Sequence, residues 1–552
     1  MIGALGWCVA GPLLAAVAAL LTPPRWARWW ALAASLLPLA VGLVFLTGFA
    51  LEPGAGFRGV ESHPWSAALG AGWTLGVDGP GAAMLALAGL VSAIATVSGW
   101  NQERHPRAYH ALVLLLLAAM DAVFTALDLV VFVVGWEVML VPMLVLIGVW
   151  GGEQRRYAAL KFLLMTLAGG AALILLLAVL WRVQPAAPSP VAVSAAAAAR
   201  YQDADGRIAG LVPVMPPAGE GAGAPGEAAT RAQIVVAVPR GFDLRHLALR
   251  APALAHERAL GLALPMLGLI AVALACLVKI PAVPLHTWLP HAHVQAPTAV
   301  SVLLAGILLK LGVFGLWRVA WPLFPDAVLA AAPVLGGLGL AGLLWTAWVA
   351  LGQRDLKRLV AYSSVSHMGW CLIGLASLTT AGALGAMVQA VAHGFSSALL
   401  FLLVGVLYDR AHHRRIDGFG GLVGPMPRFC WVLLIACLAG AGLPALAGFV
   451  GEALAFIGAV HAGGGWGWVA AAAAPSVVLA AAYNLWAYQR VATGPLRHPE
   501  QAAFPDLDRR ELVAVLPLVA LLLLVGLWPA PLVDALRPAL EAANALVHEA
   551  RP

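Results

Sequence analysis

Apolar runs long enough to cross a lipid bilayer follow one another along almost the whole of this 552-residue chain. A membrane-spanning helix needs about 20 apolar residues. We place about fourteen such runs, bounded by Pro, Gly or charged residues, at residues 2–22, 29–50, 80–100, 109–127, 129–150, 157–181, 259–282, 296–317, 328–351, 357–378, 381–407, 428–461, 466–489 and 511–529. Only 11% of the residues are charged, against roughly a quarter in soluble proteins. We therefore predict an all-α polytopic membrane protein with about fourteen transmembrane helices.

Two of the predicted spans are interrupted near their middle. Pro281 and Pro284 break the seventh span just after Lys279, and Pro444 breaks the twelfth span within residues 441–448. Proline removes a backbone donor, and broken backbone at membrane depth is tolerated only where it is packed in protein or lines a wet cavity. Two broken helices five spans apart are typical of a transporter built from paired repeats. We therefore predict two inverted five-helix repeats, made of spans four to eight and nine to thirteen.

The predicted domains follow from these repeats. They are residues 1–108 with three helices and an outside loop, 109–317 with the first repeat and a long outside insertion at 183–258, 318–490 with the second repeat, and 491–552 with the last helix and a tail. Within the insertion, residues 185–232 are rich in Ala, Pro and Gly, which is typical of a poorly ordered segment. We expect it to be a tolerated insertion.

The basic residues predict the orientation of the chain. The loops that we assign to the inside carry seventeen arginines and lysines, whereas the short outside loops carry only Arg58 and Arg318. Such a bias marks the cytoplasmic side, so we expect a bacterial inner-membrane protein with both termini outside. The five cysteines form no CxxC pair, and there is no Walker-type run and no GxGxxG placed between a strand and a helix, which argues against an iron–sulfur cluster and against nucleotide binding in this chain.

Lysine is the most informative residue type in this sequence. The chain has 28 arginines but only four lysines, of which Lys161, Lys279 and Lys310 lie inside predicted spans and Lys357 at the inner surface. Arginine cannot release its proton in a protein, whereas a buried lysine can. A buried charge costs about 2.5–3.5 kcal/mol even on a lenient scale. We therefore predict that Lys279 and Lys310 carry protons. Lys161 is either a carrier or a side chain that reaches the inner surface.

Other ionisable residues accompany the lysines inside the spans. Glu137 lies mid-span without a charged neighbour in sequence, and Glu452 follows the break of the twelfth span. His367 and His393 lie inside the tenth and eleventh spans, and a neutral imidazole can accept and donate at the same time, as a proton relay requires. No second histidine and no acid stands near either histidine at metal-binding spacing, so we expect no metal. Asp121, in the fourth span, is either an exit-side acid or a helix-end residue.

Each of these residues also has a structural interpretation. Lys279 could cap the carbonyls freed by the break, and Lys310 could form an ion pair that only holds the bundle together. Glu137 and Glu452 could be neutral hydrogen-bonding acids, and the histidines could be ordinary core residues. These alternatives stay open from the sequence.

Four stretches of the chain resemble the antiporter-like subunits of respiratory complex I. Gly135-Trp136-Glu137 with Met139 and Pro142 resembles their fifth helix. Residues 278–290 resemble the seventh helix, 295–310 the eighth, and 355–369 the stretch that enters the tenth. The twelfth-helix position is a lysine in the L-type and N-type subunits and a glutamate in the M-type, and here it is Glu452. The chain therefore resembles the M-type subunit over roughly residues 75–550, apart from the insertion.

The resemblance implies a role for each position. It implies Glu137 and Lys279 as the input pair, Lys310 and His367 as the central relay, and Glu452 as the terminal site facing the outside exit; the position of His393 also resembles the M-type. The implied activity is proton translocation within an NADH:quinone oxidoreductase, driven by quinone reduction in sister subunits. Those sister subunits would hold FMN, iron–sulfur clusters and quinone, so no cofactor is expected in this chain. The expected partners are other membrane subunits, chiefly the L-type and N-type, and the lipid bilayer, but no nucleic acid.

The sequence departs from the family pattern at two places, and two other functions are compatible with it. His291 stands where family members more often have an acid or a lysine, and the 183–258 loop is longer than the family implies. The chain could instead be the equivalent subunit of a related complex, namely a cation/proton antiporter, a membrane-bound hydrogenase or a photosynthetic complex. A non-pumping scaffold, whose buried charges only hold the bundle, is the alternative from another functional class.

Overall fold

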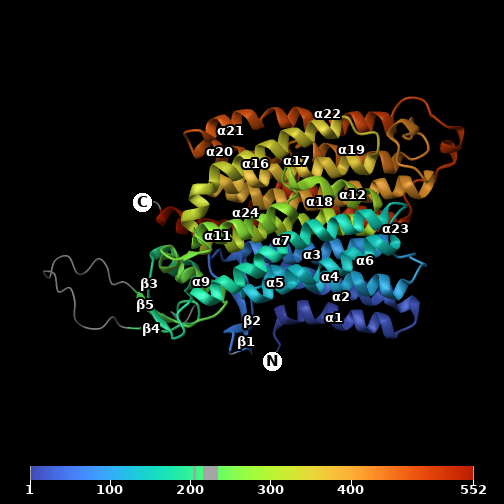
Figure 1. The fold of residues 1–552 in the computed structure, drawn as a ribbon. Helices are drawn as coiled ribbons and strands as arrows, with labels where there is room; N and C mark the ends of the chain where they lie inside the picture. The colour runs from blue at the N-terminus through green and yellow to red at the C-terminus, as the bar shows by residue number, and fades with distance from the viewer. Residues whose placement is uncertain (1, 67, 203–206, 215–233, 551–552) are drawn as a thin grey trace.

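Long helices that lie side by side along one direction make up most of the protein (Figure 1). The computed structural model describes residues 2–66, 68–202, 207–214 and 234–550. The helices of the first half are α1 (Ala4–Leu21), α2 (Pro24–Leu51), α3 (Gly79–Ser98), α4 (Pro106–Thr125), α5 (Leu129–Val138), α6 (Leu140–Trp150), α7 (Arg155–Val183), α8 (Ala195–Tyr201), α9 (Leu244–Leu249), α10 (Ala251–Leu254), α11 (Leu264–Lys279) and α12 (Trp288–Gln295).

The second half of the chain continues the helical bundle. Its helices are α13 (Thr298–Leu303), α14 (Leu309–Gly315), α15 (Trp321–Leu323), α16 (Pro325–Leu351), α17 (Leu356–Ala376), α18 (Thr380–Ala411), α19 (Pro427–Gly440), α20 (Ala447–His461), α21 (Trp466–Ala473), α22 (Pro475–Ala492), α23 (Arg509–Leu527) and α24 (Ala530–Glu549). The short strands are β1 (Arg58–Ser66), β2 (Ala71–Val77), β3 (Ser189–Val193), β4 (Pro213–Val214), β5 (Ile234–Val238), β6 (Arg258–Ala259) and β7 (Leu262–Ala263).

The predicted number of spans and both predicted breaks are confirmed. Twelve helical stretches of the described residues are long and apolar enough to cross a membrane. Two further spans are interrupted: α11 ends at Lys279 before α12 begins, and α19 ends at Gly440 before α20 begins. The all-α polytopic fold with broken seventh and twelfth spans is therefore as expected.

Three features of the helices were not expected. The fifth span is interrupted at Met139, between α5 and α6. The eighth span contains two π-helical turns, Leu304–Leu308 and Leu316–Ala320, on either side of α14. π-helical turns leave some backbone carbonyls without their usual helical partners and are frequent at functional sites. Finally, α24 follows the last span and packs against α2, α8 and α18.

Loops predicted to lie inside meet at one end of the bundle, which we call the arginine-rich end. There the Gly152 amide donates a hydrogen bond to the Gln295 carbonyl at 2.9 Å, and the Arg414 guanidinium donates to the Val294 carbonyl at 2.8 Å. These bonds join loops that are far apart in sequence. The grouping of loops into two sides, which the sequence predicts from its charges, is therefore present in the fold.

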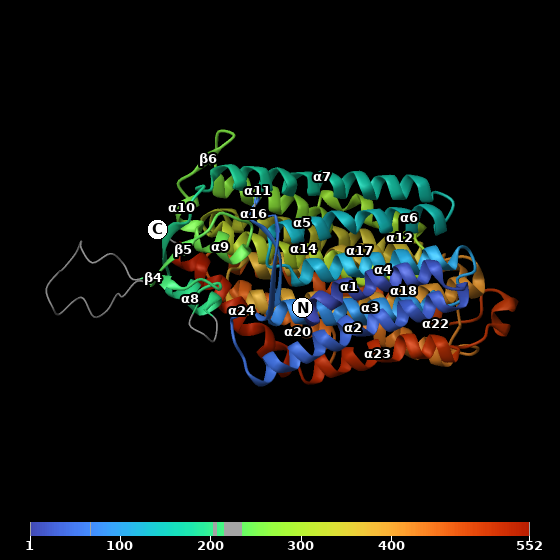
Figure 2. The same cartoon turned by 90° about the horizontal axis from the view of Figure 1, so that it is seen from below.

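The strands gather at the opposite end, which we call the strand end (Figures 1 and 2). β1 pairs with β2, β5 lies between β3 and β4, and β6 pairs with β7, all antiparallel. Both ends of the chain lie here: the Gly3 amide donates to the Glu61 carboxylate at 2.9 Å, and Glu549 accepts from the Ala196 amide at 3.1 Å. The first predicted repeat begins with α4 at the arginine-rich end and the second with α16 at the strand end, as inverted units should. Their exact boundaries stay a prediction.

The insertion is more ordered than its composition indicates. Residues 185–202 include β3 and α8, and Ser194 caps α8 by accepting a hydrogen bond from the Ala197 amide at 3.2 Å. The expectation of poor order is wrong for these residues. Residues 203–206 and 215–233 lie outside the described part of the chain.

The sequence predicts that Arg318 lies in a short outside loop, and this prediction is wrong. It lies in the second π-helical turn of the eighth span and its side chain is only 3% exposed. Its guanidinium binds both carboxylate oxygens of Asp78, at 2.6 and 2.8 Å, and Arg200 of the insertion binds the same carboxylate at 2.7 Å. The two guanidiniums therefore tie α3, the eighth span and the insertion together. We call Asp78, Arg200 and Arg318 the strand-end ion cluster.

The insertion should therefore contribute to stability through Arg200. We expect Arg200→Leu to lower the free energy of unfolding by about 1.5–3 kcal/mol, the usual worth of a hydrogen bond to a charged group. The thermal unfolding midpoint of the purified protein measures this change, and Arg258→Leu, at an exposed position of β6 in the same segment, is the control. An unchanged midpoint in the Arg200 variant would show that Arg318 alone satisfies Asp78.

Candidate proton-transfer site

Glu137 lies in the last turn of α5, next to the interruption of the fifth span, and Lys279 contacts the residues around that interruption. Lys279, the last residue of α11, has its ammonium 4.0 Å from the centre of the Trp136 ring and 2.7 Å from the Met139 sulfur. The two predicted partners form no ion pair in the described structure, although they are close enough to interact electrostatically. One oxygen of Glu137 is buried without a hydrogen-bond partner.

A glycine makes room for the Glu137 carboxylate. A Cβ atom built at Gly170, in α7, would come within 1.6 Å of Glu137 Oε1. Any side chain at this position would therefore displace the carboxylate. The geometry fits a pair that is separated in this state, with Glu137 turned to α7 and Lys279 resting on the Trp136 ring.

Lys161 lies apart from the other predicted carriers. It is half-buried on α7, with its ammonium 3.5 Å from His291 Nδ1 and 5.8 Å from the centre of the Tyr157 ring. His291 in turn contacts the Thr287 carbonyl oxygen at 2.8 Å. Lys161 therefore has a local contact with α12, and the structure gives it no hydrogen bond to the residues described next.

Lys310 lies at the centre of the bundle and is fully buried on α14. Its ammonium is 2.7 Å from His393 Nδ1 and also donates to the Ala305 carbonyl, which lies in the first π-helical turn. Among the described residues no carboxylate forms an ion pair with this lysine, and its polar contacts are the His393 imidazole and the Ala305 carbonyl. The partner of Lys310 is the imidazole of His393. A neutral imidazole can accept a proton at one nitrogen and donate one from the other.

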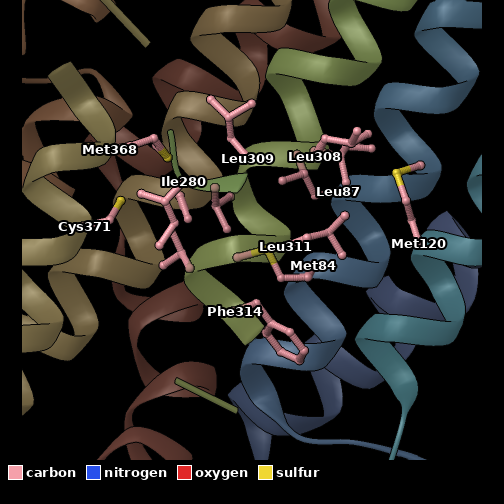
Figure 3. Close-up of a cluster of buried hydrophobic side chains, with 14 of the residues drawn as sticks. Met84, Leu87, Met120, Ile280, Leu308, Leu309, Leu311, Phe314, Met368 and Cys371 are labelled. Atoms are coloured by element: carbon pink, nitrogen blue, oxygen red, sulfur yellow. The ribbon is translucent and has the colours of Figure 1, made fainter. Parts of the chain in front are cut away.

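Buried apolar side chains lie next to Lys310 along the eighth span and on neighbouring helices. Figure 3 shows a cluster of them from the eighth span, α3, α4 and α17, together with Ile280 at the end of α11. Its labelled members are Met84, Leu87, Met120, Ile280, Leu308, Leu309, Leu311, Phe314, Met368 and Cys371. An ammonium in such surroundings is costly unless it is hydrogen-bonded, so the His393 and Ala305 contacts decide whether Lys310 can hold its proton.

The line continues from His393 to Glu452. The rings of His393 and His367 lie 5.6 Å apart between centres, and His367 Nδ1 is 2.9 Å from Glu452 Oε1. The Gln389 amide donates to the same glutamate oxygen at 3.2 Å, and the Tyr483 hydroxyl lies 3.4 Å from His367 Nε2. Residues from α14, α17, α18 and α20 thus form one buried series, which we call the central line: Lys310, His393, His367 and Glu452.

The break of the twelfth span makes room for the last residue of the central line. Gly442 lies in this break with a φ of +68°, and a Cβ atom there would come within 2.6 Å of Glu452 Oε2. Both the left-handed backbone and the close approach require glycine. The broken helix therefore places a short loop of backbone directly against the carboxylate.

Sequence reasoning missed several buried polar residues. Gln389 of α18 and Tyr483 of α22 both contact His367. The signal for Gln389 was a polar residue four positions before His393. Lys357, placed by the sequence analysis at the inner surface, is only 3% exposed because it packs beneath the α12–α13 connection. Asp121 is fully buried in α4, and neither carboxylate oxygen has a partner among the described residues.

Comparison with known proteins places this bundle in a family. The sequence profile described as NADH:quinone oxidoreductase/Mrp antiporter, TM, matches residues 126–186 and 244–477. The chain is also 36% identical over 515 residues to NADH-quinone oxidoreductase subunit M of Rhodobacter capsulatus, which covers 93% of this chain and 90% of that protein. The chain belongs to this family as an M-type antiporter-like subunit.

Other relatives agree with the assignment to the M-type. NAD(P)H-quinone oxidoreductase chain 4 1 of Synechococcus sp. (strain JA-3-3Ab) is 34% identical over 527 residues, covering 94% of this chain and 88% of the relative. The structure of respiratory complex I from Thermus thermophilus with bound NADH contains a chain that matches with a TM-score of 0.77 and 28% identity, covering 98% of this chain and 99% of that one. The Mrp complex from Dietzia sp. DQ12-45-1b shares the fold, with a TM-score of 0.71 at 23% identity, over 98% of this chain and 52% of that one.

The family match covers the candidate site but skips part of the insertion. Glu137, Lys279 and the whole central line fall inside the matched ranges of this M-type subunit, whereas residues 187–243 fall outside them. Of the strand-end ion cluster, only Arg318 falls inside the matched ranges, whereas Asp78 and Arg200 fall outside them.

Proposed function

We propose that this M-type subunit moves protons across a bacterial inner membrane as part of an NADH:quinone oxidoreductase. The observation that carries the proposal is the central line, in which Lys310, His393, His367 and Glu452 follow one another through the buried middle of the bundle. The names of the relatives support the link to NADH and quinone chemistry. A scaffold would not need four titratable side chains in series.

The proposed transfer begins when Glu137 and Lys279 separate. Lys279 then releases its proton to the neutral Lys310 amine, forming an ammonium that donates to His393 Nδ1. Lys310 returns to the neutral amine as His393 takes up the proton, and His393 returns to the neutral ring as it gives one proton to His367. His367 then gives one proton to the Glu452 carboxylate, which becomes the neutral acid. Lys279 takes up a new proton from water on the arginine-rich side and pairs again with Glu137, which resets the input, and Glu452 releases its proton towards the strand end and becomes a carboxylate again.

The energetics of this transfer are modest. Moving one charge against about 150 mV costs roughly 3.5 kcal/mol. Each tenfold change in the proton affinity of a carrier is worth about 1.4 kcal/mol. Changes of two to three powers of ten in proton affinity along the line, driven by charge movements in sister subunits, would therefore be sufficient.

The remaining assignments of this proposal concern orientation, partners and cofactors. The arginine-rich end would face the cytoplasm by the positive-inside rule, which puts both chain ends outside. L-type and N-type subunits would be the membrane partners. FMN, iron–sulfur clusters and quinone would belong to sister subunits, since the five cysteines here are scattered, buried and unpaired.

The input pair offers the first test of this proposal. We expect Glu137→Gln and Lys279→Ala to assemble normally but to lower proton pumping and quinone-linked activity together, by at least about tenfold, or 1.4 kcal/mol in barrier height. Pumping in vesicles, normalised to assembled complex on native gels, is the measurement. Glu257→Gln, at an exposed position of the strand end, is the control. Full pumping by either variant would remove the pair from the mechanism.

A further inference from the structure

Exposed tryptophans gather where α2 begins, at the arginine-rich end and at the outer edge of the bundle (Figure 1). Trp26, Trp29 and Trp30 lie in the first two turns of α2 and are 42–50% exposed. The Trp29 ring packs edge to face on Trp100, from the loop after α3, with the ring centres 4.9 Å apart. Tryptophan is enriched at the level of the lipid headgroups, because its ring is apolar and its N–H is polar. These rings therefore mark the headgroup level at this edge.

Four arginines lie in the same two stretches of chain. Arg25 and Arg28 belong to the first two turns of α2, Arg104 comes just before α4, and Arg107 lies in its first turn. Glu103 is the only acid within residues 22–30 and 99–110. Among the described residues, none of the four arginines forms an ion pair with this or any other carboxylate. The chain therefore offers these cations no anion of its own.

Arg28 is held in place but keeps donors free. Its guanidinium carbon lies 4.9 Å from the centre of the Trp100 ring, and Nη1 donates to the Trp100 carbonyl at 3.4 Å, which is a long hydrogen bond. Its Nε is buried and has no partner in the described structure. A guanidinium has five N–H donors, and a buried donor without an acceptor is costly. An anion beside Trp100 would supply the missing acceptor.

Small residues bring α1, α2 and α4 together next to these arginines. Ala19 of α1, Ala27 of α2 and Ala111 of α4 are buried in one cluster that consists almost entirely of alanines. Arg28 follows Ala27 directly, and Arg107 lies one turn before Ala111 on the same face of α4. The backbones that carry Arg28 and Arg107 therefore converge. No side chain caps the first amides of α2, so the positive end of its helix dipole adds to the charge of the arginines.

An apolar face of α1 runs from this point towards the strand end. Its side chains are 40–79% exposed and recur at helical spacing: Leu13, Leu14, Val17, Leu20 and Leu21. A molecule with its anionic group at the arginines would find an apolar surface of membrane depth directly beside it. A phospholipid has this combination of an anionic headgroup and long acyl chains.

We propose that the α1–α2 turn, together with Arg107, binds the phosphate of an anionic phospholipid whose acyl chains lie along the exposed face of α1. Arg25, Arg28 and Arg107 donate to the phosphate oxygens, for which the planar guanidinium is well suited. A lipid with net negative charge is favoured over a zwitterionic one, because the zwitterion brings its own cation to a site that already has three. The site requires only that the arginine-rich end meets a bilayer surface, so it does not depend on the proposed proton transfer.

Photocross-linking on the parent complex tests the preference for an anionic lipid. The purified complex is reconstituted with phosphatidylglycerol or with phosphatidylcholine, each carrying the same photoactivatable group on an acyl chain. Mass spectrometry then measures the cross-links to residues 13–30. We expect phosphatidylglycerol to label this segment at least fivefold more than phosphatidylcholine. Equal labelling would indicate ordinary contact with the bilayer, and no labelling by either would indicate that a sister subunit covers this face; each result would overturn the proposal.

A double variant tests whether the arginines are responsible. Arg25→Gln with Arg28→Gln should lower the labelling by phosphatidylglycerol at least fivefold and leave that by phosphatidylcholine unchanged. The matched control, Arg155→Gln with Arg156→Gln, changes two arginines in the first turn of α7 at the same end and should not alter labelling of residues 13–30. A preference that survives the loss of Arg25 and Arg28 would overturn the proposal. Excess inorganic phosphate should not compete with the lipid; competition would show a site for a free anion instead.

Discussion

Lys310→Arg should leave the complex assembled and reduce proton pumping at least tenfold. Arginine keeps the positive charge and most of the apolar stem, but it stays protonated at any accessible pH. In the structure Lys310 donates to His393 Nδ1 and to a backbone carbonyl, and both acceptors suit a fixed cation as well as a transient one. Only a step in which Lys310 becomes neutral would fail in the arginine variant.

Lys310→His distinguishes proton transfer from damage by the larger guanidinium. Histidine loses the length of the lysine but can gain and release a proton, so the relay predicts that it pumps better than the arginine variant. A fixed structural charge predicts the opposite order, since histidine is the poorer permanent cation. Both variants are measured by proton uptake in reconstituted vesicles, normalised to assembled complex. If Lys310→Arg pumps as the parent does, the central line is not the route.

Lys357 lies deeper in the protein than its position in the sequence predicts. The sequence places Lys357 at the first turn of a span, which is typical of a residue that reaches the membrane surface. In the fold, the α12–α13 connection covers it and leaves it only 3% exposed. Burial by a distant loop depends on tertiary packing, which local periodicity does not reveal.

The helices and their breaks could be predicted from the sequence, because they depend on residues that are close together along the chain. The broken spans at Lys279 and Gly440 follow from proline and glycine, which act on their own backbone neighbours. The π-helical turns around α14 could not be predicted in this way, because no residue type requires them. They arise in a helix that is buried on all sides, where packing rather than propensity sets the backbone.

The sequence predicts which residues form the candidate site, but it predicts only some of the contacts between them. Buried Lys, Glu and His stand out in an apolar sequence because each is costly to bury. That His393 rather than His367 contacts Lys310 depends on how α14 and α18 pack, 83 residues apart in sequence. The role of Arg200 could not be predicted for the same reason. Its Ala-rich surroundings in the sequence indicate a dispensable loop, but its side chain is part of a buried ion cluster.

The strand-end ion cluster should give the largest stability effect in the molecule. Burial raises the pKa of Asp78, but Arg318 and Arg200 outweigh it and lower the pKa to about 2. A carboxyl whose pKa is depressed by folding stabilises the fold above its unfolded pKa of about 4 and loses that contribution only as pH falls towards 2. Asp78 is therefore ionised, and needed as an anion, throughout the physiological range.

Asp78→Asn should lower the free energy of unfolding by about 3–5 kcal/mol, because it leaves two buried guanidiniums without a carboxylate. Asparagine caps a helix as well as aspartate does, so the cap on the Gly81 amide can be retained, while the change removes the charge and one of the two oxygens that accept from the guanidiniums. The thermal unfolding midpoint of the purified complex is the measurement. Asp508→Asn, at the largely exposed N-cap of α23, makes the same substitution without buried partners and should leave the midpoint unchanged.

The double variant decides whether charge balance is the cause. Arg200→Leu alone removes a partner of Asp78 and should destabilise the protein. In the Asp78→Asn background the same change removes one of two unpaired buried cations, so it should raise the unfolding midpoint instead. A sign reversal of this kind arises only when the residues interact directly, which a double-mutant cycle measures. If Arg200→Leu lowers the midpoint equally in both backgrounds, Arg200 acts through packing against Phe57 and Trp317 rather than through Asp78.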